Sequence, residues 1–156
     1  MKRALIISLI VILMQLITSA YAHQQVSVLN AWVRSAPPGA DVLAAYMTIQ
    51  NDSEETKVLT KVTSSMFGRI EIHKTEMSEG MMKMIPQESL PIPAGEAVTL
   101  EPGGFHLMLM APKSVPKEGE EVDLLLMFGN GHSQRIKVPV RAESDKGARM
   151  EEHGHH

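Results

Sequence analysis

The residues with the clearest chemical potential are histidines and methionines at alternating positions. Residues 105–110 have the sequence FHLMLM, so strand alternation places His106 and Met108 on one face and the phenylalanine and leucines on the other. Residues 69–74, with the sequence RIEIHK, follow the same pattern: His73 shares a face with Glu71, while the isoleucines point to the opposite side. Both segments therefore predict a half-buried strand that presents a metal-binding side chain on its outer face.

Thioethers are concentrated in a third segment, where Met82 and Met84 share one face of the short run 81–86. Thioether sulfur is soft and uncharged and selects Cu(I), whereas imidazole binds copper in both oxidation states. A neutral site of two histidines and two methionines leaves the ion with its single charge and so favours Cu(I) over Cu(II). These donor types indicate copper carriage more than copper redox catalysis.

The composition excludes several classes of metal protein and enzyme. The chain of 156 residues contains 12 methionines and no cysteine, which excludes disulfide frameworks, thiolate and iron–sulfur sites, blue-copper centres and catalytic cysteines. A catalytic zinc site requires three harder ligands and an open water position. The formal net charge of −3 gives no electrostatic indication of nucleic-acid binding.

The amino-terminal residues 1–22 have the pattern of a secretory signal peptide. Two basic residues precede an apolar run over 4–17, and Ala20-Tyr21-Ala22 fits the cleavage rule for small residues. We therefore expect cleavage before His23 and a protein that is periplasmic or otherwise exported, without stable membrane insertion. No cysteine lies near the cleavage point, so we expect no lipid attachment there.

The central residues predict an all-β domain over 23–141, a sandwich or a barrel-like sandwich of about eight or nine strands. Apolar residues alternate with a period of two in short runs separated by turns such as 91–95 and Gly129-Asn130-Gly131. No segment between 24 and 141 sustains a helical apolar stripe. The expected strands cover 25–33, 42–50, 57–63, 69–76, 81–86, 97–101, 105–111, 121–128 and 133–141.

Several segments resemble the PCu(A)C-type periplasmic copper chaperones. The family motif His-x10-Met-x21-His-x-Met is present as His73, Met84, His106 and Met108. Further similar segments are Ala31-Trp32-Val33-Arg34, Pro37-Pro38-Gly39, Ala44-Ala45-Tyr46, Gly68 to His73 and Pro102 to Met110. The similarity extends from about residue 27 to residue 141.

The resemblance implies a cupredoxin-like β-sandwich that binds Cu(I) and is not an enzyme. It implies His73, Met84, His106 and Met108 as the ligands. It also implies transfer of copper to or from partner proteins, either subunits of respiratory cytochrome oxidase during assembly of its copper centres or another copper chaperone.

The carboxyl-terminal residues 142–156 lack apolar periodicity and are expected to form a flexible tail. The tail is either a solvated terminus or an accessory site, because clustered imidazoles bind copper. Tails with histidine and methionine in similar proteins are associated with Cu(II) uptake, which here implies Met150, His153, His155 and His156. The amine and imidazole of His23 form a further candidate Cu(II) site after cleavage.

The remaining methionines and aromatic residues have simpler interpretations. Met82 is a substitute ligand or a neighbour of the site, Met110 is expected to pack, and Met77 and Met81 are candidate donors at the rim. Core packing is expected for Met47, Met66 and Met127. Trp32 and Tyr46 are expected in the core or at its rim, and His132 in solvent.

Two other functions remain open at the level of sequence. A copper-dependent redox enzyme would need an open coordination position and a substrate pocket. A metal-free β-sandwich scaffold would use its methionines only for packing.

Overall fold

The computed structural model describes residues 25–142. The predicted signal peptide, His23 and the tail from residue 143 onward lie outside the described residues, and predictions about them stay predictions. Residues 25–142 form ten strands and no helix. It follows that this part of the chain holds no helix with the length and apolarity needed to cross a membrane.

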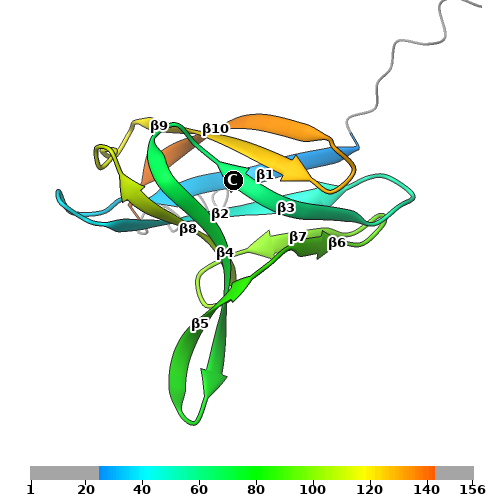
Figure 1. Cartoon of the computed structure of the whole chain (residues 1–156), viewed down its shortest axis with the longest axis horizontal. Helices are drawn as coiled ribbons and strands as arrows, with labels where there is room; N and C mark the ends of the chain where they lie inside the picture. Colours follow the sequence, from blue (N-terminus) through cyan, green and yellow to red (C-terminus); the bar gives the residue numbers. More distant parts are fainter. Residues whose placement is uncertain (1–24, 143–156) are drawn as a thin grey trace, which may run out of the picture.

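The ten strands confirm the all-β class (Figure 1). Their bounds are β1 Val26–Arg34, β2 Val42–Asn51, β3 Lys57–Thr63, β4 Phe67–Ser78, β5 Met81–Gln87, β6 Leu90–Ile92, β7 Ala97–Leu100, β8 Phe105–Pro112, β9 Glu121–Phe128 and β10 Ser133–Arg141. Each of the nine expected strands is present, with ends shifted by at most two residues.

The expected number of eight or nine strands is too low, because β6 forms where the sequence indicated only a turn. This strand pairs with β3 and lies at the end of the strand order, so its other edge has no partner strand among residues 25–142. Proline cannot donate a backbone hydrogen bond, but an edge strand tolerates it. Pro91 therefore does not prevent pairing, although a proline at this position makes the sequence resemble a turn.

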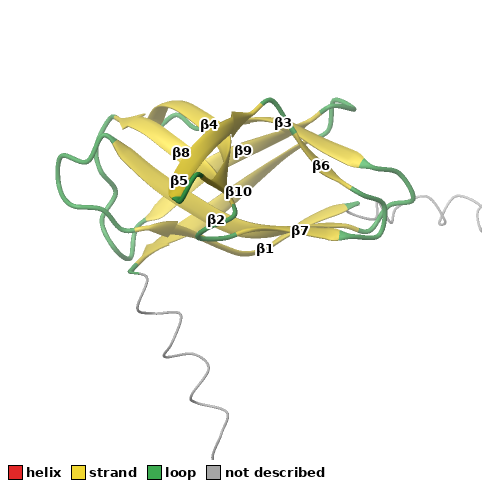
Figure 2. Ribbon diagram, turned by 90° about the horizontal axis from the view of Figure 1, so that it is seen from below, coloured by secondary structure: helices red, strands yellow, loops and turns green. Residues whose placement is uncertain are grey.

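The strands form two halves of one continuous sheet, which enclose the core from two sides (Figure 2). One half has the order β5-β4-β8-β7-β2-β1, with an additional β8–β2 pairing, and the other has the order β10-β9-β3-β6. A short parallel contact joins them, in which Val33 of β1 pairs with Val140 of β10. This arrangement agrees with the expected sandwich.

Alternation along the strands determines the core. Leu107 and Leu109 of β8 are fully buried in the same cluster as Leu124 and Leu126 of β9, so both halves contribute to one core. The prediction for β8 is confirmed, since Phe105 also packs against this cluster. The prediction for Met127 is wrong: this side chain follows Leu126 on β9 and points outward, with 38% of its surface exposed.

The hairpin of β4 and β5 extends away from the rest of the molecule (Figure 1). Its connecting residues Glu79 and Gly80 have φ angles of 52° and 76°, as a two-residue type I′ turn requires. Gly80 adopts this conformation at little cost because it has no Cβ. The turn fixes the hairpin register, in which Ser78 pairs with Met81.

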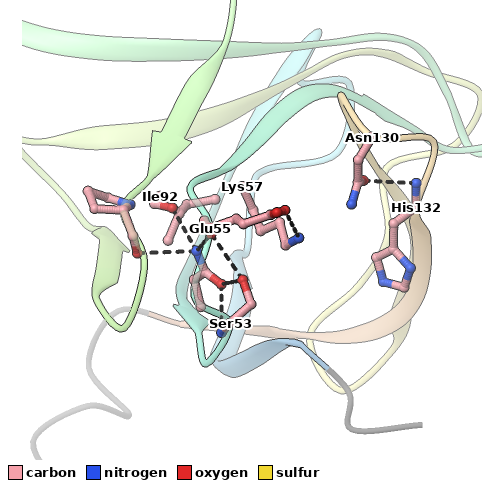
Figure 3. Close-up of polar contacts among 8 residues, drawn as sticks. Ser53, Glu55, Lys57, Ile92, Asn130 and His132 are labelled. Atoms are coloured by element: carbon pink, nitrogen blue, oxygen red, sulfur yellow. Dashed lines mark hydrogen bonds and ion pairs between the residues drawn. The ribbon is translucent and has the colours of Figure 1, made fainter.

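Asn51 at the end of β2 connects three segments through its fully buried side chain. Its Nδ2 donates to the carbonyl oxygens of Glu55, at 2.8 Å, and Ile92, at 2.9 Å. Its Oδ1 accepts hydrogen bonds from the backbone N–H and the hydroxyl of Ser53. Figure 3 shows these contacts around Ser53, Glu55 and Ile92, which tie the loop after β2 to the edge strand β6.

Replacing Asn51 with alanine should lower the free energy of unfolding by about 3 kcal/mol, because the carbonyls of Ile92 and Pro93 lose their Nδ2 donor and a buried carbonyl without a donor costs about 1–3 kcal/mol. Urea unfolding of the variant and the parent measures the difference. Asn130→Ala is a matched control, because that exposed side chain accepts a single hydrogen bond from the His132 backbone. Equal losses in the two variants would contradict a central role for Asn51.

Candidate functional site

Two buried histidines face each other across neighbouring strands. His73 of β4 pairs directly with His106 of β8, and their ring centroids are 5.9 Å apart. Only 7% of His73 and 3% of His106 is exposed to solvent. The placement of His106 excludes a solvated surface role, and burial of two polar rings carries a cost unless their nitrogens are satisfied.

One nitrogen of each ring donates a hydrogen bond to an acceptor on its own strand or in the adjoining turn. His73 Nε2 donates to Glu71 Oε2 at 2.8 Å, and His106 Nδ1 donates to the carbonyl oxygen of Gly104 at 3.2 Å. The carboxylate and the carbonyl can only accept, so these contacts set which nitrogen of each neutral ring carries the proton. The lone pairs consequently belong to His73 Nδ1 and His106 Nε2.

These two lone-pair nitrogens are buried, and within residues 25–142 neither has a hydrogen-bond partner. Buried nitrogen atoms without partners are uncommon in folded proteins, and metal or catalytic sites are one established cause. Metal-binding histidines commonly donate their second ring nitrogen to a carboxylate or a backbone carbonyl, as both rings do here.

Glu71 is held from two sides. Its Oε1 lies 2.8 Å from Arg69 Nε, while its Oε2 accepts the hydrogen bond from His73. The hydrogen bond from His73 holds the pKa of the Glu71 carboxyl below its usual range; burial opposes this effect, and the positive charge of Arg69 adds to it. Glu71 therefore stays ionised and fixes the orientation of the His73 ring.

Met108 lies on the histidine face. It follows His106 by two residues on β8, pairs across the sheet with Glu71, and is half-buried. As a diagonal neighbour of His73 across the β4–β8 pair, it is within reach of that ring, because such positions are about 7–8 Å apart.

Met84 approaches the same face from a third strand. It pairs with Thr75 of β4, which makes it a diagonal neighbour of His73 across the β4–β5 pair. Its side chain is 58% exposed. The four residues selected by the motif thus occupy adjacent positions on one face of β8, β4 and β5.

Other predicted residues lie near this face or away from it. Met77 and Met82 pair directly on the outer part of the hairpin, whereas Met81 points to its opposite face. The sulfur of Met110 accepts a hydrogen bond from Arg69 Nη2 at 3.1 Å, in agreement with its predicted packing role. The remaining outcomes are that Met47 is buried, Met66 packs against the core, Trp32 and Tyr46 are buried with ring centroids 4.9 Å apart, and His132 is exposed.

Sequence analysis did not identify the supporting roles of Glu71, Arg69 and Gly104. For Glu71 a usable indication was its spacing of two from His73, which places both side chains on one face. The Gly104 carbonyl had no such indication, because backbone acceptors depend on the path of the chain rather than on residue type.

The donor set suits a soft ion. It offers two neutral imidazole nitrogens, with thioethers on the same face, and soft donors of this type select Cu(I). Within the described part of the chain, no group of three or more histidine, cysteine, aspartate or glutamate residues could hold a metal ion. A site made only of harder ligands is therefore absent from residues 25–142.

The comparisons with known proteins place the chain in a family. The family model described as "Putative lipoprotein LpqE-like" matches residues 26–140. The chain belongs to this LpqE-like lipoprotein family. It is also 33% identical over 117 residues to "Putative lipoprotein Lxx21020" from Leifsonia xyli subsp. xyli (strain CTCB07), which covers 74% of this chain and 69% of that protein.

Solved structures of other proteins have the same fold as this LpqE-like family member. The copper-bound PCuAC domain from PmoF2 matches with a TM-score of 0.66 and 22% identity over 78% of this chain and 97% of that domain. The solution structure of CuI-DR1885 from Deinococcus radiodurans matches with a TM-score of 0.61 and 29% identity over 81% of this chain and 84% of that chain. The resemblance stated from the sequence is confirmed for the fold, which is of the PCuAC type.

The His106 imidazole should titrate below its usual pKa of 6.5, because burial lowers this pKa, with the Gly104 hydrogen bond opposing and the charge of His73 adding to the decrease. A histidine with a lowered folded-state pKa stabilises the fold above the unfolded-state value and loses that contribution as the pH falls below it. The metal-free protein should therefore lose stability as the pH falls from 7 through the folded-state pKa of His106.

NMR titration of the imidazole and urea unfolding at several pH values measure both effects. The variant His106→Gln is the control, and its stability should depend less steeply on pH in this window. A titration midpoint at or above 6.5 would contradict the assignment of His106 as a buried neutral ring.

Proposed function

We propose that this protein is an exported carrier of Cu(I), which it binds through His73 Nδ1, His106 Nε2 and the sulfurs of Met84 and Met108. The observation that supports the proposal most directly is the pair of buried ring nitrogens on β4 and β8, which have no hydrogen-bond partner among residues 25–142. In a metal-free scaffold, burial of both nitrogens would cost free energy, and nothing would compensate for it.

The charge of the site supports the univalent ion. Both rings are neutral in the hydrogen-bonded forms described above, and thioethers carry no charge. The negative charge of Glu71 is shared with Arg69 and directed at the far nitrogen of His73. Four neutral donors of this kind stabilise Cu(I), whereas Cu(II) prefers nitrogen and oxygen in a tetragonal arrangement.

The distribution of exposure supports carriage in place of permanent binding. The histidines are buried, but Met84 lies on the projecting hairpin with more than half of its surface in solvent. A partner protein could displace this exposed ligand first and take the ion by successive ligand exchange. Such transfer requires no acid, base or nucleophile, so we propose a carrier and not an enzyme.

The comparisons support copper as the cargo. One similar structure is the copper-bound PCuAC domain from PmoF2, and another is CuI-DR1885. We propose donors and acceptors of copper as the partners, with subunits of cytochrome oxidase or another copper chaperone as the specific candidates. Relatives named as lipoproteins support an exported, cell-envelope location, for which we propose the periplasm.

Removing both thioethers should weaken Cu(I) binding by more than about 100-fold, since even partners outside the ligand shell contribute about 10–100-fold to metal affinity. The measurement is anaerobic titration of Met84→Ala/Met108→Ala against a chromophoric Cu(I) chelator. The control, Met81→Ala/Met127→Ala, removes two exposed thioethers that do not share the histidine face. Equal affinity of the parent and the Met84/Met108 variant would refute the ligand assignment.

Glu71→Ala should weaken Cu(I) binding by about 10–100-fold, because His73 loses the acceptor that fixes its ring and its proton. Glu76→Ala is the matched control on the same strand, since Glu76 pairs with Lys74 on the opposite face. Nitrogen-15 NMR of the metal-free protein adds a structural readout, in which the parent should carry the His73 proton on Nε2. A mixture of tautomers in the parent would argue against this positioning role.

A further inference from the structure

The β4–β5 hairpin exposes an unusual amount of apolar surface. Among the described residues, eight large apolar side chains are exposed, and the five on this hairpin are Met77, Met81, Met82, Met84 and Ile85. Scattered exposed apolar residues need no explanation, but a concentration on one projecting element indicates a functional surface. Four of these five side chains are methionine, so thioether sulfur is the shared chemical feature.

The hairpin register places three of the thioethers in a row on the face that carries His73. Met77 pairs directly with Met82, and the next pair on this face toward the body of the molecule is Thr75 with Met84. Side chains directly opposite in an antiparallel pair have Cβ atoms about 4.5–5.5 Å apart. Methionine has three rotatable side-chain bonds, so two such thioethers can converge on one ion.

Three charged side chains of the hairpin, those of Lys74, Glu76 and Lys83, occupy its other face. Lys74 and Glu76 form an ion pair with a separation of 3.0 Å, and Lys83 pairs across the hairpin with Glu76. The Met77–Met82 face therefore presents sulfur without a competing carboxylate or amine from these three residues. Soft donors alone select Cu(I) and discriminate against Zn²⁺, Ca²⁺ and Mg²⁺.

Exposure decreases along this row of donors toward the histidines. Met77 is 71% exposed, Met82 is 66% exposed and Met84 is 58% exposed, whereas the two histidine rings are buried. An ion arriving on another molecule meets the outer thioethers before it can reach the imidazoles. The arrangement provides donors for stepwise exchange between solvent and the buried nitrogens.

We propose that Met77 and Met82 form a second, weaker Cu(I) position, through which copper reaches Met84 and then the histidine pair. The inference rests on the proposed function, because it assigns a route to the same site. In the inward step, one Cu–S bond to the outer pair breaks as a Cu–S bond to Met84 forms, and bonds to His73 and His106 replace the remaining outer sulfur. Copper stays univalent throughout, and no electron or proton is transferred.

The test uses the full chain with ¹³C-methyl methionine, to which Cu(I) is added anaerobically in two equivalents. The first equivalent should shift the methyl signals of Met84 and Met108, and the second should shift those of Met77 and Met82 while Met127 stays unchanged. Absence of Met77 and Met82 shifts at the second equivalent would overturn the inference and leave the primary site intact. Absence of shifts at Met84 and Met108 with the first would instead refute the proposed function.

A kinetic comparison separates sulfur chemistry from apolar docking. Met77→Leu/Met82→Leu preserves apolar volume and removes both sulfurs, so Cu(I) transfer from a chelator complex should slow while the affinity of the first equivalent is unchanged. Met81→Leu/Met127→Leu is the matched control and should load at the rate of the parent. If the Met77/Met82 variant also loaded at the parental rate, the outer pair would not lie on the copper route.

Discussion

The pairing of β4 with β8 is the constraint on which the rest of the site depends. It places His73 directly opposite His106, so the two rings approach each other even though they come from distant parts of the chain. The same pairing brings Met108 opposite Glu71. Because side chains alternate along both strands, the packing of Leu107 and Leu109 in the core holds the polar partners on the other face. A slip of one residue would exchange these faces, and core burial opposes that slip.

The histidine pair combines burial with incomplete hydrogen bonding. Glu71 and Gly104 each satisfy one ring nitrogen, and the second nitrogen of each ring is left available. In the metal-free protein this arrangement costs free energy, because buried polar atoms without partners lose their hydration. The surrounding sheet holds the rings in place, so a bound ion would not have to organise them.

The β4–β5 hairpin provides accessible donors beside this rigid pair. It extends from the molecule, and its type I′ turn keeps the thioethers of both strands in register. Rigid buried imidazoles favour retention of a soft ion, whereas exposed thioethers on an edge hairpin favour exchange. The proposed binding and release of copper would make use of both properties. The LpqE-like family member described here has them on adjacent strands of one face.

Much of the fold and of the candidate site is encoded locally and could be predicted. Alternation in residues 105–110 establishes which side chains of β8 share a face, and turn residues separate most of the strands. The exceptions have local causes as well. Pro91 makes β6 resemble a turn in the sequence, yet an edge strand tolerates proline, and Met127 lies outside the core because alternation directs it outward.

Residue chemistry and a period of two are enough to establish the donor types, their faces and the all-β class. The tertiary structure adds that both histidines are buried, that Glu71 and Gly104 each accept a hydrogen bond from one ring, and that the other ring nitrogens lack partners within the described part of the chain. It also decided that the β4–β5 thioethers remain in solvent. Strand register and burial arise from contacts between segments distant along the chain, whereas the Glu71 and Gly104 contacts are local and depend on the side-chain conformation and on the path of the backbone. A repeat within one strand carries no information about which strand will lie beside it.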